Sequence, residues 1–356
     1  MTVRIGFIGS GFARRVQLPA LPFVPETRAT AIASGRRANA EAVAREFGLP
    51  HVFDDGVELA RSADVDLVIV SSTPDSHARY AIAALEAGKH VLCEKPMALD
   101  TYEAAQMVAA AERRPDRFAW VDHELRYEPN RRRARGLIRS GAIGDVRHIE
   151  LSLKPYLRGD GRPQASDAPW TWWFDAARGG GILGAVGSHL IDLCRYWTGS
   201  EVTYVGGLVE TFVAERTDES GVKRPVTADD FTSSVLRMAS GAVATITLST
   251  VAHHGPGHLG QVTGSEGTLL LTGETKLELG KAGGGGPLED VSATDDLWAK
   301  TKPNNMWARS FVRLLRDMVR VIGGAAPEGE PAAFRDGWQV QRVLDAIRGG
   351  RGVRLD

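Results

Sequence analysis

Short apolar runs alternate with amphipathic stretches over residues 1–122. Three of these runs, IGFIG, LVIVS and HVLCE, lack polar alternation, as is typical of strands covered on both faces. The predicted strands span residues 3–8, 30–34, 67–71, 90–93 and 118–121. The predicted helices span residues 38–47, 76–87 and 102–113. Strand–helix alternation of this kind predicts a Rossmann-type α/β fold, with a doubly wound parallel sheet and right-handed crossovers.

After Asp122 the pattern changes to successive strands separated by turn signals such as Ser240-Gly241. The predicted strands span residues 146–156, 202–212, 231–238, 243–250, 260–263 and 268–271. The predicted helices span residues 129–140, 186–197, 305–322 and 334–347. Consecutive strands predict an α+β domain built on a large, mainly antiparallel open sheet. We therefore expect two domains, residues 1–122 and residues 123–356.

Composition narrows the class of protein. The 356 residues are 43% hydrophobic and 24% charged, with a formal net charge of −1, so no basic surface for nucleic acid is indicated. The chain enters a strand pattern directly and has no apolar run long enough to cross a bilayer, so we expect a cytoplasmic protein without a membrane partner. Cys93 and Cys194 are too few for a disulfide framework, and the histidine spacing predicts no metal site.

A glycine turn follows the first strand. Gly9 and Gly11 flank Ser10 where a helix is predicted to begin, and glycines in that position let backbone N–H groups approach a pyrophosphate. Phe12 and Arg14 belong to the same predicted cofactor site. Arg14 stands where Gly or Ala is usual, so we expect its side chain to point out of the turn. The alternative is a turn that only packs a strand on a helix.

Ser34, Arg36 and Arg37 follow the second predicted strand, where a carboxylate usually holds the ribose 2′-hydroxyl of NAD. A carboxylate repels a 2′-phosphate, whereas a hydroxyl and guanidinium groups bind one. This pattern favours NADP over NAD. The competing interpretation is that the two arginines are solvated at the start of a surface helix.

The carboxyl edge of the predicted sheet carries further cofactor candidates, because ligands bind at that edge in doubly wound folds. Ser72, Thr73 and Pro74 follow one buried strand, and His77 opens the next helix as a cofactor, capping or packing residue. Glu94 and Lys95 follow the strand at 90–93. Beside a cationic nicotinamide the pKa of Lys95 is expected to fall toward neutrality, although pairing with Glu94 opposes that shift. Glu94 is also placed to hold the nicotinamide ribose, and a surface lysine at a helix start is the alternative.

The strings AGKHVLCEKPMAL (residues 87–99) and GGGILGAVGSHLIDL (residues 179–193), together with the glycine turn, resemble the glucose–fructose oxidoreductase, inositol dehydrogenase and rhizopine-catabolism family (Gfo/Idh/MocA). Similar strings over nearly the whole chain are LRYEP, SGAIGDV, GSEGTL and DGWQVQRVLDAI. The resemblance implies an NAD(P)-dependent oxidoreductase acting on sugars, cyclitols or related polyols. It also implies a second domain for substrate binding and for assembly into a homodimer or homotetramer.

The resemblance places the family's catalytic lysine at Lys95 and its catalytic histidine at His189. Many members carry an aspartate four residues before this histidine, where the present chain has Ala185, which cannot relay a proton. Asp192 can reach the same helix face and orient the imidazole. The alternative role for Asp192 is that of a structural partner elsewhere on that helix.

Substrate contacts are predicted less directly. Trp172 and Trp173 precede the triple glycine, and aromatic faces suit the C–H faces of sugar rings, although packing under a loop is the other interpretation. Arg126, Tyr156 and Asp175 are further candidates.

The cofactor motifs and the family resemblance together predict direct hydride transfer between a substrate carbinol carbon and the nicotinamide. Lys95 and His189 are the expected joint acid and base. One alternative is a non-catalytic NAD(P)-binding regulatory protein on the same scaffold, which Ala185 and Arg14 favour. Another is an epimerase or lyase that cycles a tightly bound cofactor through oxidation and reduction.

Overall fold

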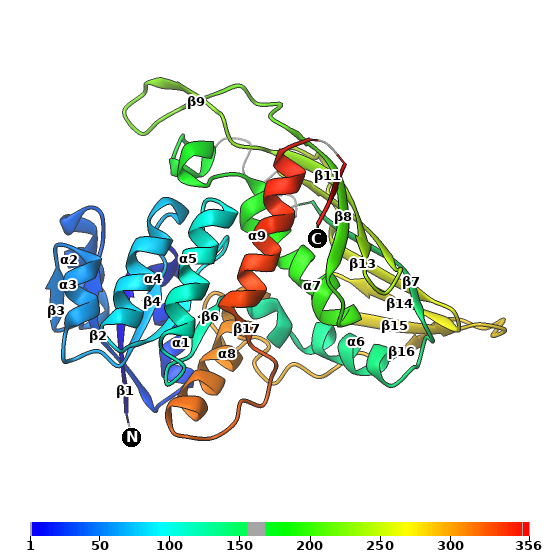
Figure 1. Cartoon of the computed structure of the whole chain (residues 1–356), viewed down its shortest axis with the longest axis horizontal. Helices are drawn as coiled ribbons and strands as arrows, with labels where there is room; N and C mark the ends of the chain where they lie inside the picture. Colours follow the sequence, from blue (N-terminus) through cyan, green and yellow to red (C-terminus); the bar gives the residue numbers. More distant parts are fainter. Residues whose placement is uncertain (1, 155–167, 351, 356) are drawn as a thin grey trace. The chain divides into compact units, whose positions relative to one another are not determined.

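The computed structural model describes residues 2–154, 168–350 and 352–355 (Figure 1). The chain forms two compact units. One unit comprises the chain up to Glu128 together with Asp296–Gln341, and the other comprises Pro129–Asp295 together with the chain from Arg342. This division differs from the expected boundary after residue 122, because a late segment of the chain folds with the first unit.

The first unit is built on a seven-stranded sheet with the strand order β17-β6-β5-β4-β1-β2-β3. Its strands are β1 (Val3–Ile8), β2 (Thr27–Ala33), β3 (His51–Phe53), β4 (Leu67–Val70), β5 (His90–Cys93), β6 (Ala119–Val121) and β17 (Ala332–Ala333). Pairings among β1–β6 are parallel, and only the short β17 pairs antiparallel. Its helices are α1 (Leu18–Ala20), α2 (Arg37–Phe47), α3 (Gly56–Arg61), α4 (His77–Glu86), α5 (Thr101–Glu112), α8 (Met306–Ile322) and the start of α9 (Phe334–Arg348). The predicted Rossmann-type fold is confirmed.

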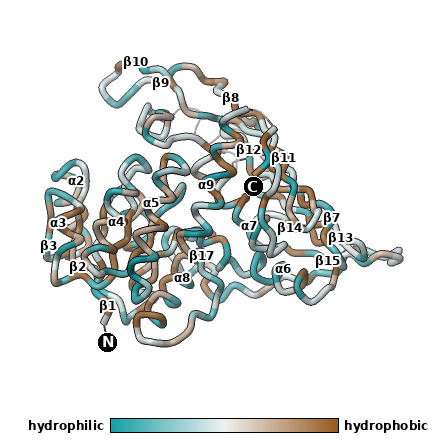
Figure 2. The backbone as a smooth tube through the Cα atoms, viewed as in Figure 1, coloured by the Kyte–Doolittle hydropathy of each residue, from teal (hydrophilic) through white to brown (hydrophobic). Residues whose placement is uncertain are grey.

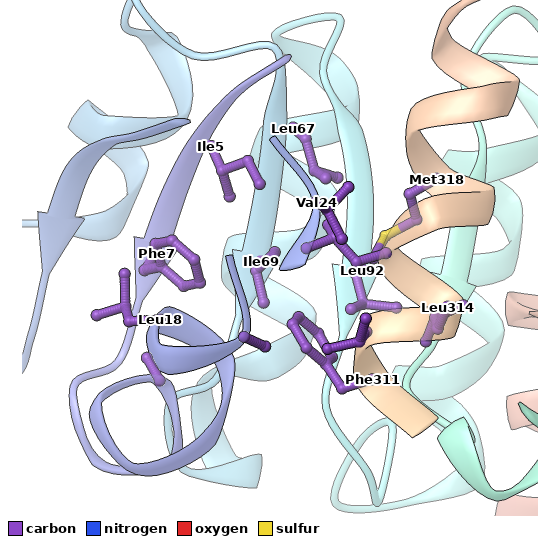
Figure 3. Packing of buried hydrophobic residues seen from close by; sticks show 14 of the residues in the cluster. Ile5, Phe7, Leu18, Val24, Leu67, Ile69, Leu92, Phe311, Leu314 and Met318 are labelled. Atoms are coloured by element: carbon purple, nitrogen blue, oxygen red, sulfur yellow. The ribbon is translucent and has the colours of Figure 1, made fainter. Parts of the chain in front are cut away.

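Alternate residues of the central strands enter two separate cores. Ile69 and Leu92 belong to the core on one face of the sheet, whereas their neighbours Val70 and Cys93 belong to the core on the other. Helix α8 covers the first of these faces through Phe311, Leu314 and Met318 (Figure 3). Burial on both faces explains why these strands read as continuous apolar runs.

The second unit is built on a nine-stranded sheet with the strand order β16-β15-β14-β13-β7-β12-β11-β8-β18. Its strands are β7 (Val146–Lys154), β8 (Val202–Glu210), β11 (Phe231–Met238), β12 (Val243–Ser249), β13 (Gly257–Gly264), β14 (Gly267–Thr272), β15 (Lys276–Lys281), β16 (Glu289–Asp290) and β18 (Val353–Arg354), with a separate hairpin of β9 (Glu215–Thr217) and β10 (Lys223–Pro225). In the described part of this second sheet only β7 and β12 pair in parallel, so the mainly antiparallel sheet is confirmed.

In the described part of this unit, two α-helices accompany the sheet, together with the end of α9. They are α6 (Pro129–Arg139), which is rich in arginine and mainly teal in Figure 2, and α7 (Ser188–Thr198). The residues of β11 alternate between a buried face, which carries Leu236, and an accessible face, which carries Val235. Among the helices that the structure describes, none is both long and apolar enough to traverse a bilayer.

Candidate active site

The glycine turn after β1 leaves one side of the backbone open. Gly9 has a φ of 110°, and a Cβ there would lie 2.2 Å from the Ser71 carbonyl oxygen, so only glycine fits. A Cβ built on Gly11 meets no atom within 4 Å. Helical backbone begins at Gly11 and widens into a π-helix over Ala13–Gln17. The open side at Gly11 therefore fits a phosphate-bearing cofactor.

Several polar and charged side chains follow β2, where the sequence predicts the ribose-binding part of the cofactor site. The hydroxyls of Ser34 and Ser10 lie 3.0 Å apart. Arg37 pairs with Glu41 at 2.9 Å and with Asp54 at 2.5 Å, whereas Arg36 is exposed at the start of α2. Arg14 pairs with Glu46 at 2.6 Å, so its guanidinium points toward α2. The guanidinium groups of Arg14 and Arg37 are thus both engaged in ion pairs with carboxylates of the chain.

The loop after β4 is held by its own side chains. The Ser76 hydroxyl donates to Ser72 Oγ at 2.7 Å, and Thr73 Oγ1 contacts the Asp75 carboxylate. Pro74 is buried. The ring nitrogens of His77 lie 3.0 Å and 3.1 Å from the carbonyl oxygens of Pro96 and Ser72. His77 therefore ties the loops after β4 and β5 together, which is a packing role.

Lys95 lies immediately after β5, at the carboxyl edge of the sheet. Its side chain is 13% exposed, and its Nζ atom lies 3.6 Å from Glu94 Oε2. Aromatic rings flank the same atom, with centroids at 5.3 Å for Phe12 and 5.5 Å for Trp307. The ammonium group is therefore enclosed by one carboxylate and two rings.

Three buried carboxyl groups surround this lysine. Gln17 Nε2 donates to Glu94 Oε1 at 2.9 Å and lies 3.4 Å from Asp122 Oδ2. Asp122 and Glu124, which follow β6, are fully buried. Burial raises the pKa of Glu124 to about 8, a shift that the charge of Lys95 opposes and that of Glu94 reinforces. Burial also raises the pKa of Asp122 well above its ordinary value, with Glu124 and Glu94 adding to the effect.

The groups of the chain that lie around Lys95 oppose the fall in its pKa that is expected beside a cationic nicotinamide. Burial by itself lowers this pKa. The charges of Glu94, Glu124 and Asp122, together with a hydrogen bond to Glu94, outweigh burial and raise the pKa above its ordinary value. Sequence reasoning considered Glu94 alone and missed the two carboxyl groups that follow β6.

In the second unit, His189 lies in the first turn of α7 and is fully buried. The preceding residues Leu183–Gly187 form a π-helix, and Ala185 lies within it. A π-helix also follows the glycine turn, and such segments occur frequently at functional sites.

Asp192 has an ion-pair partner on the same helix. Its Oδ1 atom lies 3.7 Å from Arg195 Nη1, and Arg195 also binds Glu201 through Nε at 2.7 Å. These contacts support the interpretation of Asp192 as a structural partner.

The predicted substrate contacts differ in their surroundings. Asp175 accepts a hydrogen bond from the Ala177 amide and caps a short turn. Arg126 is buried, pairs with Asp336 at 3.3 Å and donates to the Glu330 carbonyl oxygen. Trp172 and Trp173 are half-buried and pack edge to face with centroids 6.0 Å apart. Tyr156 lies outside the described residues.

Two further features of the site region bear on its chemistry. Within the described ranges, no cluster of three or more His, Cys, Asp or Glu residues could hold a metal ion. Cys93 and Cys194 are buried free thiols, and burial raises the pKa of both.

The sequence motifs missed four residues of the Lys95 environment, namely Gln17, Asp122, Glu124 and Trp307. Asp122 and Glu124 directly follow an apolar strand whose neighbour carries Lys95, and that adjacency is a usable signal. Trp307 has no such signal, because it belongs to a helix far along the chain.

Comparison with known proteins places the chain in a family. Residues 3–123 match the family described as oxidoreductase family, NAD-binding Rossmann fold, and residues 131–270 match the GFO/IDH/MocA C-terminal domain. The chain therefore belongs to the Gfo/Idh/MocA family of NAD-binding oxidoreductases, and its first unit contains the NAD-binding domain.

Particular relatives are similar over most of the chain. An uncharacterized oxidoreductase of Synechocystis is 32% identical, with 75% of this chain and 71% of the relative covered. Levoglucosan dehydrogenase of Pseudarthrobacter phenanthrenivorans is 28% identical, with 97% and 95% covered. A solved structure of levoglucosan dehydrogenase in complex with NADH and levoglucosan superimposes with a TM-score of 0.87 at 25% identity, covering 100% of both chains.

Proposed function

We propose that the protein transfers a hydride between a nicotinamide cofactor and a secondary hydroxyl or keto group of a sugar, cyclitol or related polyol. The observation that carries this proposal is the enclosed Lys95 ammonium at the carboxyl edge of the nucleotide-binding sheet, beside Phe12 of the glycine turn. The similarity to levoglucosan dehydrogenase supports a sugar-like substrate.

The nicotinamide, when bound, supplies the hydride donor or acceptor. Gly9 and Gly11 give the cofactor phosphates access to backbone N–H groups. Oxidation of a secondary alcohol removes a hydride from carbon and a proton from oxygen. Lys95 and His189 together supply the base, and one of them, either Lys95 as the amine or His189 as the neutral imidazole, accepts that single proton. In the reverse direction the Lys95 ammonium donates it.

The test begins with fluorescence titrations of NADPH and NADH, followed by turnover assays on a panel of polyols and keto sugars that includes levoglucosan. Lys95→Ala should retain cofactor affinity and lose turnover by at least about a hundredfold. Lys281→Ala, at an exposed position ending β15, is the matched control. Near-normal turnover of Lys95→Ala would refute the role of Lys95 in proton transfer.

Cofactor binding by the wild-type protein without turnover on the panel would favour a regulatory protein. Turnover with co-purified nucleotide alone would favour redox cycling of a tightly bound cofactor.

We favour NADP over NAD because the ribose region presents Ser34 and the exposed Arg36 and no carboxylate follows β2 directly. Ser34→Asp should weaken NADPH binding at least about tenfold and leave NADH binding within about twofold. Arg28→Ala, at an exposed position of β2, should change neither affinity. Equal effects of Ser34→Asp on both cofactors would contradict the preference.

We also propose that the protein is a homodimer or homotetramer. The accessible face of the second sheet exposes Tyr204, Leu208 and Val235 at 39%, 54% and 44% on the neighbouring strands β8 and β11. Leu208→Arg should shift the mass measured by light scattering toward the monomer, whereas Val222→Arg, in the β9–β10 hairpin, should not. An unchanged mass for Leu208→Arg would argue against this face.

The buried free thiols fit a reducing compartment, and we propose a cytoplasmic location.

A further inference from the structure

The Lys95 ammonium has an aromatic neighbour that no sequence motif marks. The ring centroid of Trp307 lies 5.5 Å from Lys95 Nζ, and that of Phe12 lies 5.3 Å from the same atom. Glu94 Oε2 lies 3.6 Å away, and the Lys95 side chain is 13% exposed. A cation within about 6 Å of an aromatic centroid is attracted by the electron-rich face of the ring.

The start of helix α8 positions the Trp307 ring. The Asn305 side chain caps the helix by accepting a hydrogen bond from the Ala308 amide, and Met306 is buried beside it. Phe311 lies one turn further along the helix and is fully buried in the core that includes Leu92 of β5 (Figure 3). Residues four apart share a helix face, so the buried Phe311 directs Trp307 toward the same side of the sheet.

The segment before α8 is itself held in place. Arg309 is buried, its guanidinium lies 4.4 Å from the Trp298 ring centroid, and its Nη1 donates to Asn304 Oδ1 at 2.6 Å. Asn304 Oδ1 also accepts from the Ala299 amide. These contacts fold the residues leading into α8 onto the helix itself, and they restrict the position of its first turn.

We propose that Trp307 is a positioning residue of the reaction centre: with Phe12, its indole face holds the Lys95 ammonium at the carboxyl edge of the sheet. The proposal rests on the proposed function in assigning proton transfer to Lys95. The rings leave the ammonium charged, whereas a second carboxylate in their place would bind its protons directly. Lys95 thereby keeps protons available for a substrate oxygen while its side chain is confined.

The first experiment needs neither substrate nor cofactor. The chain has eight lysines, so reductive ¹³C-methylation gives few NMR signals, and the Lys95 signal is identified by its loss in Lys95→Arg. Ring currents should displace this signal upfield from the other lysines. In Trp307→Leu the signal should move toward the others, and its pKa should fall by about half a unit to one and a half units.

The titratable groups that face Lys95 in the described unit, Glu94, Asp122 and Glu124, are untouched by this substitution. Trp307→Phe, which keeps a ring and the helix start, should give an intermediate shift. Trp298→Leu removes the other tryptophan of the same segment and should leave the Lys95 signal unchanged. An unchanged chemical shift and pKa in Trp307→Leu would overturn the proposal.

A kinetic experiment distinguishes positioning from a general structural role. Alcohol oxidation requires Lys95 as the neutral amine. Turnover in this direction therefore falls at pH values below the Lys95 pKa in the substrate complex. Trp307→Leu should lower maximal turnover about tenfold and move this acidic limb to lower pH, whereas Trp298→Leu should do neither. If Trp307→Leu lowered turnover by the same factor at every pH and left the acidic limb of the pH–rate profile in place, Trp307 would not be a positioning residue of Lys95. If the wild-type protein oxidised nothing, the proposed function would fail, and the NMR comparison would still decide the contact.

Discussion

Gln17 donates a 2.9 Å hydrogen bond to Glu94, and so joins the helical turn after the glycine loop to the carboxylate that pairs with Lys95. The same side chain accepts a 2.6 Å hydrogen bond from Ser71 and lies 3.4 Å from Asp122. One buried amide therefore connects the carboxyl ends of β4, β5 and β6. It fixes the group that holds the Lys95 ammonium.

Replacing Gln17 by methionine should destabilise the protein and impair turnover together. The substitution keeps the volume but leaves Ser71 and Glu94 without this buried partner, which should cost roughly 2 to 4 kcal/mol. Urea unfolding measures the loss. Gln261→Met, at an exposed position of β13, should change stability by less than about 0.5 kcal/mol. Equal midpoints for the two variants would show that the amide adds no net stability.

Substitutions at the two glycines of the turn should have different effects, on stability at Gly9 and on nucleotide affinity at Gly11. Gly9→Ala places a Cβ against the Ser71 backbone at a φ of 110°, so it should lower the free energy of unfolding by at least about 2 kcal/mol. Gly11→Leu meets no neighbour within the chain, so its stability should stay within about 1 kcal/mol of wild type. Its nucleotide affinity should fall at least about tenfold, because the side chain fills the phosphate space. Wild-type NADPH and NADH affinities for Gly11→Leu, measured by fluorescence titration, would contradict the assigned site.

Glu124 should make stability depend on pH. Its folded-state pKa is raised to about 8 by burial, above the ordinary value of 4.5, so the folded protein binds the proton more tightly than the unfolded chain. This contribution is complete below about pH 4.5 and is lost as the pH rises through about 8. Glu124→Gln is neutral at every pH, so between pH 4.5 and pH 8 its free energy of unfolding should fall less than that of the wild type, by roughly 4 to 5 kcal/mol.

The measurement is the free energy of unfolding in urea between pH 5 and pH 9 without added nucleotide. Glu289→Gln, on the exposed strand β16, serves as the control and should keep the wild-type slope. A Glu124→Gln profile parallel to that of the wild type would show that this carboxyl group titrates normally in the folded protein.

His189→Asn should separate chemistry from cofactor binding. We expect turnover to fall by about a hundredfold, because asparagine cannot exchange a proton near neutral pH. NADPH affinity should stay within about twofold, since the cofactor candidates lie in the other unit. His148→Asn, on the accessible face of β7, is the matched control. Turnover of His189→Asn equal to that of the control would remove His189 from the mechanism.

Much of the fold was predictable, because strand and helix patterns are local. The apolar runs at β1, β4 and β5 identified the parallel sheet, and Gly9 marked the turn after β1. Six short strands, β3, β9, β10, β16, β17 and β18, were not predicted, since segments of two or three residues carry no measurable period. Strand β15 alternates clearly in KLELGK, but its position before a glycine-rich loop obscured it. Helix α8 was predicted, whereas its packing against the first sheet was not.

The sequence alone determined that a lysine follows a buried strand and that a histidine opens a helix, because burial periodicity and glycine conformations are properties of neighbouring residues. Only the tertiary structure decided the state of that lysine. The side chains around the lysine come from separate parts of the chain, namely Phe12, Glu94, Asp122, Glu124 and Trp307. Their combined field depends on distances through space, and it raises the pKa of Lys95, whereas the local pattern predicted a fall toward neutrality beside a cationic nicotinamide.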